Sequence, residues 1–188
     1  QQAAMPLLNA NEMANADPAV AVAAVRNGSH AQAFRHVFGT DIFNHPGRAF
    51  ADIGTALAAF QAEDPGFHPY TSKFDAVMAG HARFTPRELR GYALFNDPRK
   101  GNCASCHIDV PGPGGRPAPF TDYSYATLGV PRNPAIPANR DPRYYDMGLC
   151  GPYRRDLRKH TQYCCMFKTP TLRNVATRRV FFHNGYFY

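Results

Sequence analysis

A five-residue motif, Cys103-Ala104-Ser105-Cys106-His107, constrains this chain more than any other stretch of it. The pattern C-x-x-C-H is the attachment sequence of a c-type haem. Two cysteines on one helical turn can each form a thioether with a haem vinyl group, and the adjoining histidine can then bind the iron. The sequence therefore predicts Cys103 and Cys106 as covalent anchors and His107 as the proximal ligand of the haem iron.

Two other chemistries remain open for this cysteine pair. A C-x-x-C pair alone also occurs in zinc sites and in redox dithiols. A structural zinc site requires a second matching pair of ligands, and Cys164 and Cys165 do not provide one because they are adjacent. The histidine that directly follows Cys106 favours haem over both alternatives.

Length and composition limit the kind of protein further. The 188 residues, 44% of them hydrophobic, fit one domain or two small subdomains with a core packed around a cofactor. No run of about 18 apolar residues is present, so no membrane span is expected. The chain opens Gln1-Gln2-Ala3-Ala4, without an initiator methionine or a signal peptide, which indicates a processed or partial chain.

The chain is basic, with a formal net charge of +7 and its densest positive stretch over residues 140–159. No module that reads nucleic acid is recognisable, so nucleic acid is not an expected partner. Two interpretations of the charge stay open. It is either a solvated basic face or a docking surface for an acidic redox partner, since complementary charge raises encounter rates.

Helical patterns predominate along the chain. Helices are expected over about residues 18–26, 30–38, 48–62, 72–79 and 86–95, from apolar residues that recur at three to four positions. Asp17, Ser29 and Thr85 are the expected N-caps. Residues 111–142 hold eight of the 17 prolines and are expected to form a long loop around the haem edge. The predicted class is mostly α, with long Pro/Gly-rich loops.

Three cysteines lie outside the haem motif: Cys150, Cys164 and Cys165. Haem c is attached outside the cytoplasm, where disulfides persist. One disulfide from Cys150 to either Cys164 or Cys165 is therefore expected, and it would leave one thiol over.

Several stretches of the chain follow one another in a recognisable order. Residues 6–13 (PLLNANEM) are similar to P-[LI]-x-N-P-x-E-M, with Ala10 in place of the usual proline, and residues 167–185 are close to F-K-T-P-T-L-R-N-V…H-[ND]-G. Between them come residues 58–60, 73–75, 91–95 and the haem motif. Together they resemble the bacterial di-haem cytochrome c peroxidase and MauG superfamily over nearly the whole chain.

The resemblance implies a larger enzyme than these residues encode. Members of that superfamily carry two haems in two cytochrome-c-like domains, whereas this chain has one C-x-x-C-H. The chain therefore resembles the second half of such an enzyme, truncated at both ends, with His107 on the electron-transfer haem. Residues 1–45 would belong to or contact the upstream peroxidatic haem domain, and residues 46–188 would form an incomplete cytochrome-c-like domain. The implied location is the periplasm.

Further site residues follow from the resemblance alone. Glu12 matches the acid–base that moves a proton between the oxygens of hydrogen peroxide at the peroxidatic haem, and Gln2 matches a glutamine ten positions earlier. The backbone of Lys168 and Pro170 matches a stretch that helps to hold a Ca²⁺ ion. Arg173 and Asn174 are expected to bind a haem propionate, stabilise the loop or cap a helix.

The sixth ligand of the iron is expected beyond Tyr188. Within the chain the candidates are weaker, because methionine is usually a core residue and a histidine in a turn usually bonds the backbone. They are Met147, Met166, His160 and His183.

The expected function is that of a peroxide-using, haem-c-dependent oxidoreductase that takes electrons from a small cytochrome or copper protein. One alternative is a MauG-like enzyme that oxidises residues of a partner protein, which the Cys150-Gly151-Pro152 and Tyr163-Cys164-Cys165 elements slightly favour. Another is a non-enzymatic mono-haem electron carrier. A zinc-binding structural module is the fourth possibility considered.

Overall fold

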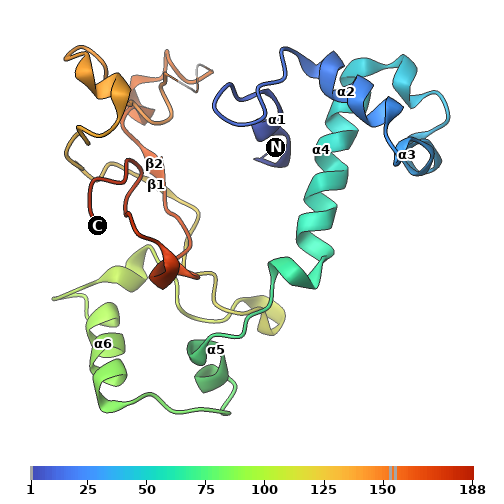
Figure 1. Ribbon diagram of the computed structural model, residues 1–188. Helices are drawn as coiled ribbons and strands as arrows, with labels where there is room; N and C mark the ends of the chain where they lie inside the picture. Colours follow the sequence, from blue (N-terminus) through green and yellow to red (C-terminus); the bar gives the residue numbers. More distant parts are fainter. Residues whose placement is uncertain (1, 153, 155) are drawn as a thin grey trace. The chain divides into compact units, whose positions relative to one another are not determined.

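Helices dominate the computed structural model, which describes residues 2–152, 154 and 156–188 (Figure 1). The predicted mostly helical class is confirmed. The chain divides into two compact units between Tyr70 and Thr71. This division lies downstream of residue 45, and the assignment of residues 1–45 to a second haem domain stays a prediction. No helix in the described residues is both long and apolar enough to cross a membrane.

The first unit is built from short helices around one long helix, α4. Its elements are η1 (Gln2–Ala4), α1 (Met5–Leu8), α2 (Pro18–Asn27), α3 (Ala31–Phe38), η2 (Ile42–Asn44), α4 (Pro46–Glu63) and η3 (Pro65–Phe67). Helix α2 packs on α4 (Figure 1). The buried core takes one or two apolar side chains from each of α2, α3, η2 and α4, namely Val22, Phe34, Ile42, Ala49 and Ile53.

Local chemistry explains where these helices begin. Asp17 caps α2, because its side chain accepts hydrogen bonds from the backbone of Ala19 and Val20, as predicted. The predicted cap of α3 by Ser29 is wrong. His30 occupies the N-cap position without a side-chain cap, because the turn before α3 is closed by a backbone bond from Ala31 to the carbonyl of Gly28.

Two short helices open the second unit, and each begins with a capping box. Helix α5 spans Lys73–Met78 and α6 spans Pro86–Asn96. In α6, the side chain of Thr85 accepts from the backbone N–H of Glu88 and the side chain of Glu88 accepts from the backbone N–H of Thr85, as predicted. Ser72 and Asp75 form the same pair of bonds in α5. Aromatic side chains pack between the helices and the later loop, in the series Phe74, Phe84, Tyr92, Phe95 and Phe120.

Beyond α6, the described residues of the second unit form loops, single turns and two short strands (Figure 1). Its elements are η4 (Cys103–Ser105), η5 (Pro113–Gly115), β1 (Tyr125–Ala126), η6 (Pro137–Arg140), η7 (Thr161–Tyr163), β2 (Phe167–Lys168) and η8 (Val175–Thr177). Strands β1 and β2 pair antiparallel, with Tyr125 opposite Lys168. This short pairing joins the proline-rich loop to the closing run of the chain.

One disulfide closes a loop in this unit, between Cys150 and Cys164. The predicted single disulfide with one thiol left over is confirmed, and the free thiol is that of Cys165. The sequence separation of the bridged cysteines is 14. Closing a loop of this length lowers the entropy of the unfolded chain, which stabilises the folded state by about 3 kcal/mol.

Replacement of both bridged cysteines by alanine should therefore lower the free energy of unfolding by about 3 kcal/mol. The measurement is urea unfolding of the haem-loaded protein under non-reducing conditions. Cys165→Ala is the matched control and should leave the disulfide and most of the stability in place. Equal stability of the double variant and the control would contradict the prediction.

Candidate haem-binding site

The cysteine motif lies in a tight turn directly after helix α6. Asn102 takes a left-handed conformation (φ 48°), and the turn η4 starts at the next residue. The backbone N–H of His107 donates to the carbonyl of Cys103 at 2.9 Å, which places the histidine one helical turn after the first cysteine. The thiols of Cys103 and Cys106 are half-buried and in no disulfide, so both are available for thioether bonds.

The tautomer of His107 is defined by its partner. The Nδ1 atom lies 3.1 Å from the backbone carbonyl oxygen of Phe120. Because a carbonyl can only accept, Nδ1 carries the hydrogen and the lone pair is on Nε2. This is the arrangement in which a histidine binds a metal through Nε2 while a carbonyl orients its ring. The side chains of the motif therefore fit a covalently bound haem with His107 as an iron ligand.

The loop after the motif folds back onto it. Phe120 donates its backbone N–H to the carbonyl of Ile108 at 2.9 Å, and Asp122 donates to the carbonyl of Cys106 at 2.8 Å. These bonds fix residues 118–122 beside His107. The loop thus lies against the motif, and its predicted contact with the edge of a haem stays a prediction.

Residues 167–173, near the end of the chain, form hydrogen bonds with this loop. Thr121 is buried and its hydroxyl donates to the carbonyl of Thr169 at 2.7 Å, while the hydroxyl of Thr171 donates to the carbonyl of Pro119 at 2.7 Å. The backbone of Thr169 also donates to the carbonyl of Ser124 at 2.8 Å. Residues 167–173 therefore stabilise the loop that carries the carbonyl partner of His107.

Arg173 completes this support. Its guanidinium forms a two-pronged ion pair with Asp75, at 3.0 and 2.9 Å, and its Nε donates to the carbonyl of Ala118 at 2.9 Å. The hydrogen bond from Arg173 lowers the pKa of Asp75 to about 2, with a smaller contribution from Ser72. Of the roles predicted for Arg173, these contacts support stabilisation of the loop. Sequence reasoning assigned no role to Asp75, whose capping of α5 gives no sign of a second partner.

A second polar cluster, formed by Tyr92, Asn96 and Asp109, was not predicted from the sequence. Asp109 is 3% exposed and accepts a hydrogen bond from the side chain of Asn96 at 2.7 Å. Burial raises the pKa of Tyr92, and the charge of Asp109 and a hydrogen bond to it act in the same direction. The cluster ties the end of α6 to the residues that follow His107.

Among the weaker candidates for the sixth ligand, both histidines pack on aromatic rings. The ring of His183 stacks on Phe167 with 3.5 Å between centroids, and burial lowers its pKa. His160 packs on Tyr163. The backbone of Met166 accepts from Leu149. Iron ligation by any of them stays a prediction, as does a ligand beyond Tyr188.

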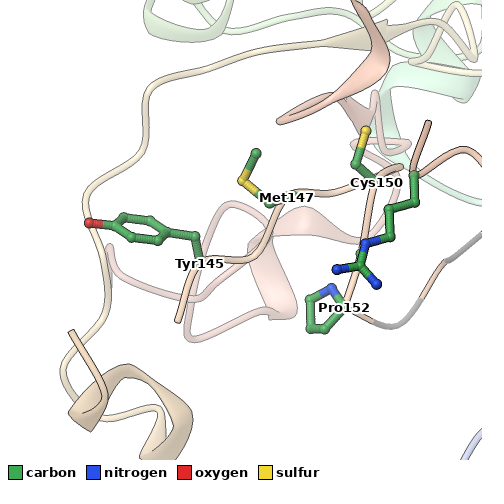
Figure 2. A pocket seen from close by; sticks show the side chains of 6 residues that line it. Tyr145, Met147, Cys150 and Pro152 are labelled. Carbon is green, nitrogen blue, oxygen red and sulfur yellow. The ribbon is translucent and has the colours of Figure 1, made fainter. Parts of the chain in front are cut away.

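Met147 lies in the loop that carries the disulfide. Its sulfur is 3.7 Å from the thiol of Cys165. Met147 and Cys150 line a cavity of about 370 Å³, and their side chains are labelled in Figure 2. The cavity is lined by Tyr145, Met147, Cys150, Gly151, Pro152 and Arg158, and none of these residues belongs to the haem motif.

Gln2 and Glu12 lie in the first unit. Gln2 starts the turn η1, and Glu12 lies in the turn that follows α1, with its side chain exposed. That turn is closed by backbone bonds from Glu12 to Asn9 at 3.0 Å and from Met13 to Pro6 at 3.1 Å. The position of the Glu12 backbone is thus fixed locally, and the catalytic roles of both residues stay predictions.

Asn174 and the suggested calcium ligands lie in the closing run. Asn174 is left-handed (φ 59°) at the start of η8 and makes no side-chain cap there. Lys168 lies in β2, and its Nζ donates to the carbonyl of Thr169 at 3.0 Å. Among the described residues, no group of three or more His, Cys, Asp or Glu side chains could hold a metal ion. A site formed by the backbone of Lys168 and Pro170 remains a prediction.

Fold and site together define a class, the c-type haem proteins: a mostly helical chain with a C-x-x-C-H turn and an oriented histidine. Comparison with known proteins narrows this class. Residues 1–83 match the family described as di-haem cytochrome c peroxidase. The chain is 36% identical to the methylamine utilization protein MauG of Paracoccus denitrificans, over the whole chain and 47% of that protein. It is 29% identical to cytochrome c551 peroxidase of Nitrosomonas europaea, over 98% of the chain and 47% of that protein.

A solved structure gives the same result. The crystal structure of the diheme peroxidase BthA from Burkholderia thailandensis matches with a TM-score of 0.82 and 40% identity, over 97% of this chain and 44% of that one. The chain belongs to the di-haem cytochrome c peroxidase and MauG family. It spans about half the length of the relatives that it matches.

Proposed function

We propose that this chain carries the electron-transfer haem of a peroxide-using di-haem oxidoreductase. The observation that carries the proposal is the bond from Nδ1 of His107 to the carbonyl of Phe120, beside two unpaired cysteine thiols. Cys103 and Cys106 would attach the haem, and His107 would bind its iron through Nε2. The haem, when bound, supplies a one-electron Fe(III)/Fe(II) couple.

Peroxide chemistry is assigned to the other haem of the complete protein, with Glu12 as the acid–base and Gln2 as a second catalytic residue. The carboxylate of Glu12 would take a proton from one oxygen of hydrogen peroxide and return it to the other. Its backbone is held by the bonded turn after α1, and its side chain is exposed. Both features suit a group that must exchange protons with a substrate.

The proposed electron donor is a small cytochrome c or copper protein in the periplasm. The net charge of +7 suits an acidic partner, because opposite charges speed encounter. A Ca²⁺ ion held by the backbone of Lys168 and Pro170 is proposed as a second cofactor, since oxygen atoms are its preferred ligands.

A MauG-like enzyme that oxidises residues of a partner protein is the second candidate. Its specific support is the 36% identity to MauG of Paracoccus denitrificans, against 29% to the cytochrome c551 peroxidase. The 40% identity to the diheme peroxidase BthA supports peroxidase function to a similar degree. A non-enzymatic mono-haem carrier is the third candidate.

The test is a count of haem in the complete protein, by pyridine haemochrome absorbance and iron analysis. We expect two covalent haems per polypeptide, one of them lost in a Cys103→Ala/Cys106→Ala variant, and a spectral change on addition of hydrogen peroxide. Peroxide-dependent oxidation of the small donor protein would then indicate peroxidase activity, as distinct from MauG-like oxidation of residues in a partner protein. One low-spin haem without any response to peroxide would overturn the proposal in favour of the carrier.

A further inference from the structure

The carbonyl that orients His107 belongs to a residue in a strained conformation. Phe120 has a φ of 50°, in the left-handed region that a bulky aromatic residue rarely adopts. Its carbonyl accepts from Nδ1 of His107 at 3.1 Å and from the backbone of Leu172 at 3.3 Å. A conformation of this kind persists only where surrounding contacts enforce it. Any group that enforces it therefore also controls the hydrogen bond to His107.

Arg173 supplies two of the enforcing contacts. Its Nε donates to the carbonyl of Ala118 at 2.9 Å, and its guanidinium carbon lies 5.5 Å from the centre of the Phe120 ring. Phe74 packs edge-on against the same ring, with 4.8 Å between centroids. The ring of Phe120 thus contacts Arg173 and Phe74. The backbone at Ala118, two residues earlier, is held by the bond from Arg173.

Asp75 fixes Arg173 in turn. The two side chains meet through two parallel bonds of 3.0 and 2.9 Å and are only 20% and 14% exposed. A planar guanidinium paired with a carboxylate in this way has one defined orientation, which a lysine in the same place would not reproduce. The plane of Arg173 is consequently set by a residue at the start of α5, 98 positions away in the sequence.

We propose that Asp75 and Arg173 act together as positioning residues that set the hydrogen bond on His107 and, through it, the electron affinity of the iron that His107 binds. The inference rests on the proposed function, because it requires a haem at His107. A firm bond from Nδ1 to a carbonyl makes the imidazole a more basic ligand. A more basic ligand stabilises Fe(III) over Fe(II), so loosening the bond should favour reduction.

The test uses Arg173→Lys and Asp75→Asn in the complete, haem-loaded protein. We expect each variant to shift the Fe(III)/Fe(II) equilibrium of the His107 haem toward Fe(II) by about tenfold, with the roughly 10- to 100-fold effect of such changes on metal affinity or activity as the guide. The potential is measured by redox titration. The EPR g values of the ferric haem, identified by loss of its signal in His107→Gly, should change as well. Measurements are made on purified haem-loaded protein, so reduced haem incorporation does not affect them.

Arg154→Lys is the matched control. Arg154 forms a two-pronged pair with Asp156 at 2.8 and 2.9 Å, but this pair is exposed and contacts no residue of the haem motif in the bonds that the structure records. The control should leave both the potential and the g values unchanged. A shift of the same size in the control would overturn the proposal, because it would show that replacing any paired arginine by lysine has this effect, wherever the pair lies.

The double variant tests whether the two residues act as one unit. Residues of one network have non-additive effects, so Asp75→Asn/Arg173→Lys should shift the equilibrium no further than either single change. Additive shifts, or unchanged potentials in both single variants, would overturn the inference. Absence of any haem at His107 in the unmodified protein would instead overturn the proposed function, so the two failures are distinguishable.

Discussion

Replacement of His107 by glycine should abolish electron transfer through the haem attached at Cys103 and Cys106. The covalent anchors are untouched, so the haem content should stay constant while the iron loses its imidazole ligand. Changing groups behind a metal ligand costs 10–100-fold in activity, and we expect loss of the ligand itself to lower peroxide-dependent donor oxidation by more than about 100-fold. Steady-state oxidation of the reduced donor, expressed per haem, measures the effect.

Added imidazole gives this experiment an internal check. The glycine variant leaves space where the ring stood, so free imidazole should bind the iron there and restore part of the low-spin spectrum. His81→Ala, a change at an exposed histidine of the same unit, should have no effect. A His107→Gly protein with an unaltered spectrum and rate would show that another residue binds the iron.

Substitution of Glu12 by glutamine is expected to lower peroxide turnover by about 10²- to 10⁴-fold, the usual contribution of a positioned acid–base. Glutamine has nearly the same size but cannot carry the proton between the two peroxide oxygens. Reduction of the His107 haem by the donor should remain unchanged, because the recorded bond of Glu12 is to Asn9 and not to a residue of the haem motif. Stopped-flow measurement of the two steps separates them.

Glu63→Gln is the matched control for this change. Glu63 is an exposed glutamate in the same unit, at the end of α4, and no catalytic role is assigned to it. Its replacement should leave both steps unchanged. Full peroxide turnover in Glu12→Gln would remove Glu12 from the proposed mechanism, and equal losses in both variants would point to a general effect of charge.

Features that depend on neighbouring residues were predictable from the sequence. The caps Asp17 and Thr85 act within one helical turn, and the spacing of Cys103, Cys106 and His107 is itself the chemical requirement for attachment. The Ser29 cap was wrong because a backbone bond between Ala31 and Gly28 closes that turn. A residue type that favours capping does not decide whether a backbone group satisfies the same turn first.

The partner of Cys150 in the disulfide could not be predicted from the local sequence alone. The sequence limited the partner of Cys150 to Cys164 or Cys165, and the structure selected Cys164. Adjacent side chains of an extended segment point in different directions, and Cys165 is moreover left-handed, with a φ of 63°. Which of the two faces Cys150 depends on how the intervening loop folds, and composition does not encode that.

The sequence by itself determined the helical class, the haem motif and the single disulfide, because each depends on residues that are close in the chain or on a fixed spacing. Only the tertiary structure decided that Phe120 orients His107 and that Asp75 fixes Arg173. These partners are 13 and 98 positions apart, and one of them is a backbone carbonyl, which every residue possesses. Hydrogen bonds of that kind do not depend on the residue type of the acceptor. They can be identified only from the structure, in which the loop is folded onto the motif.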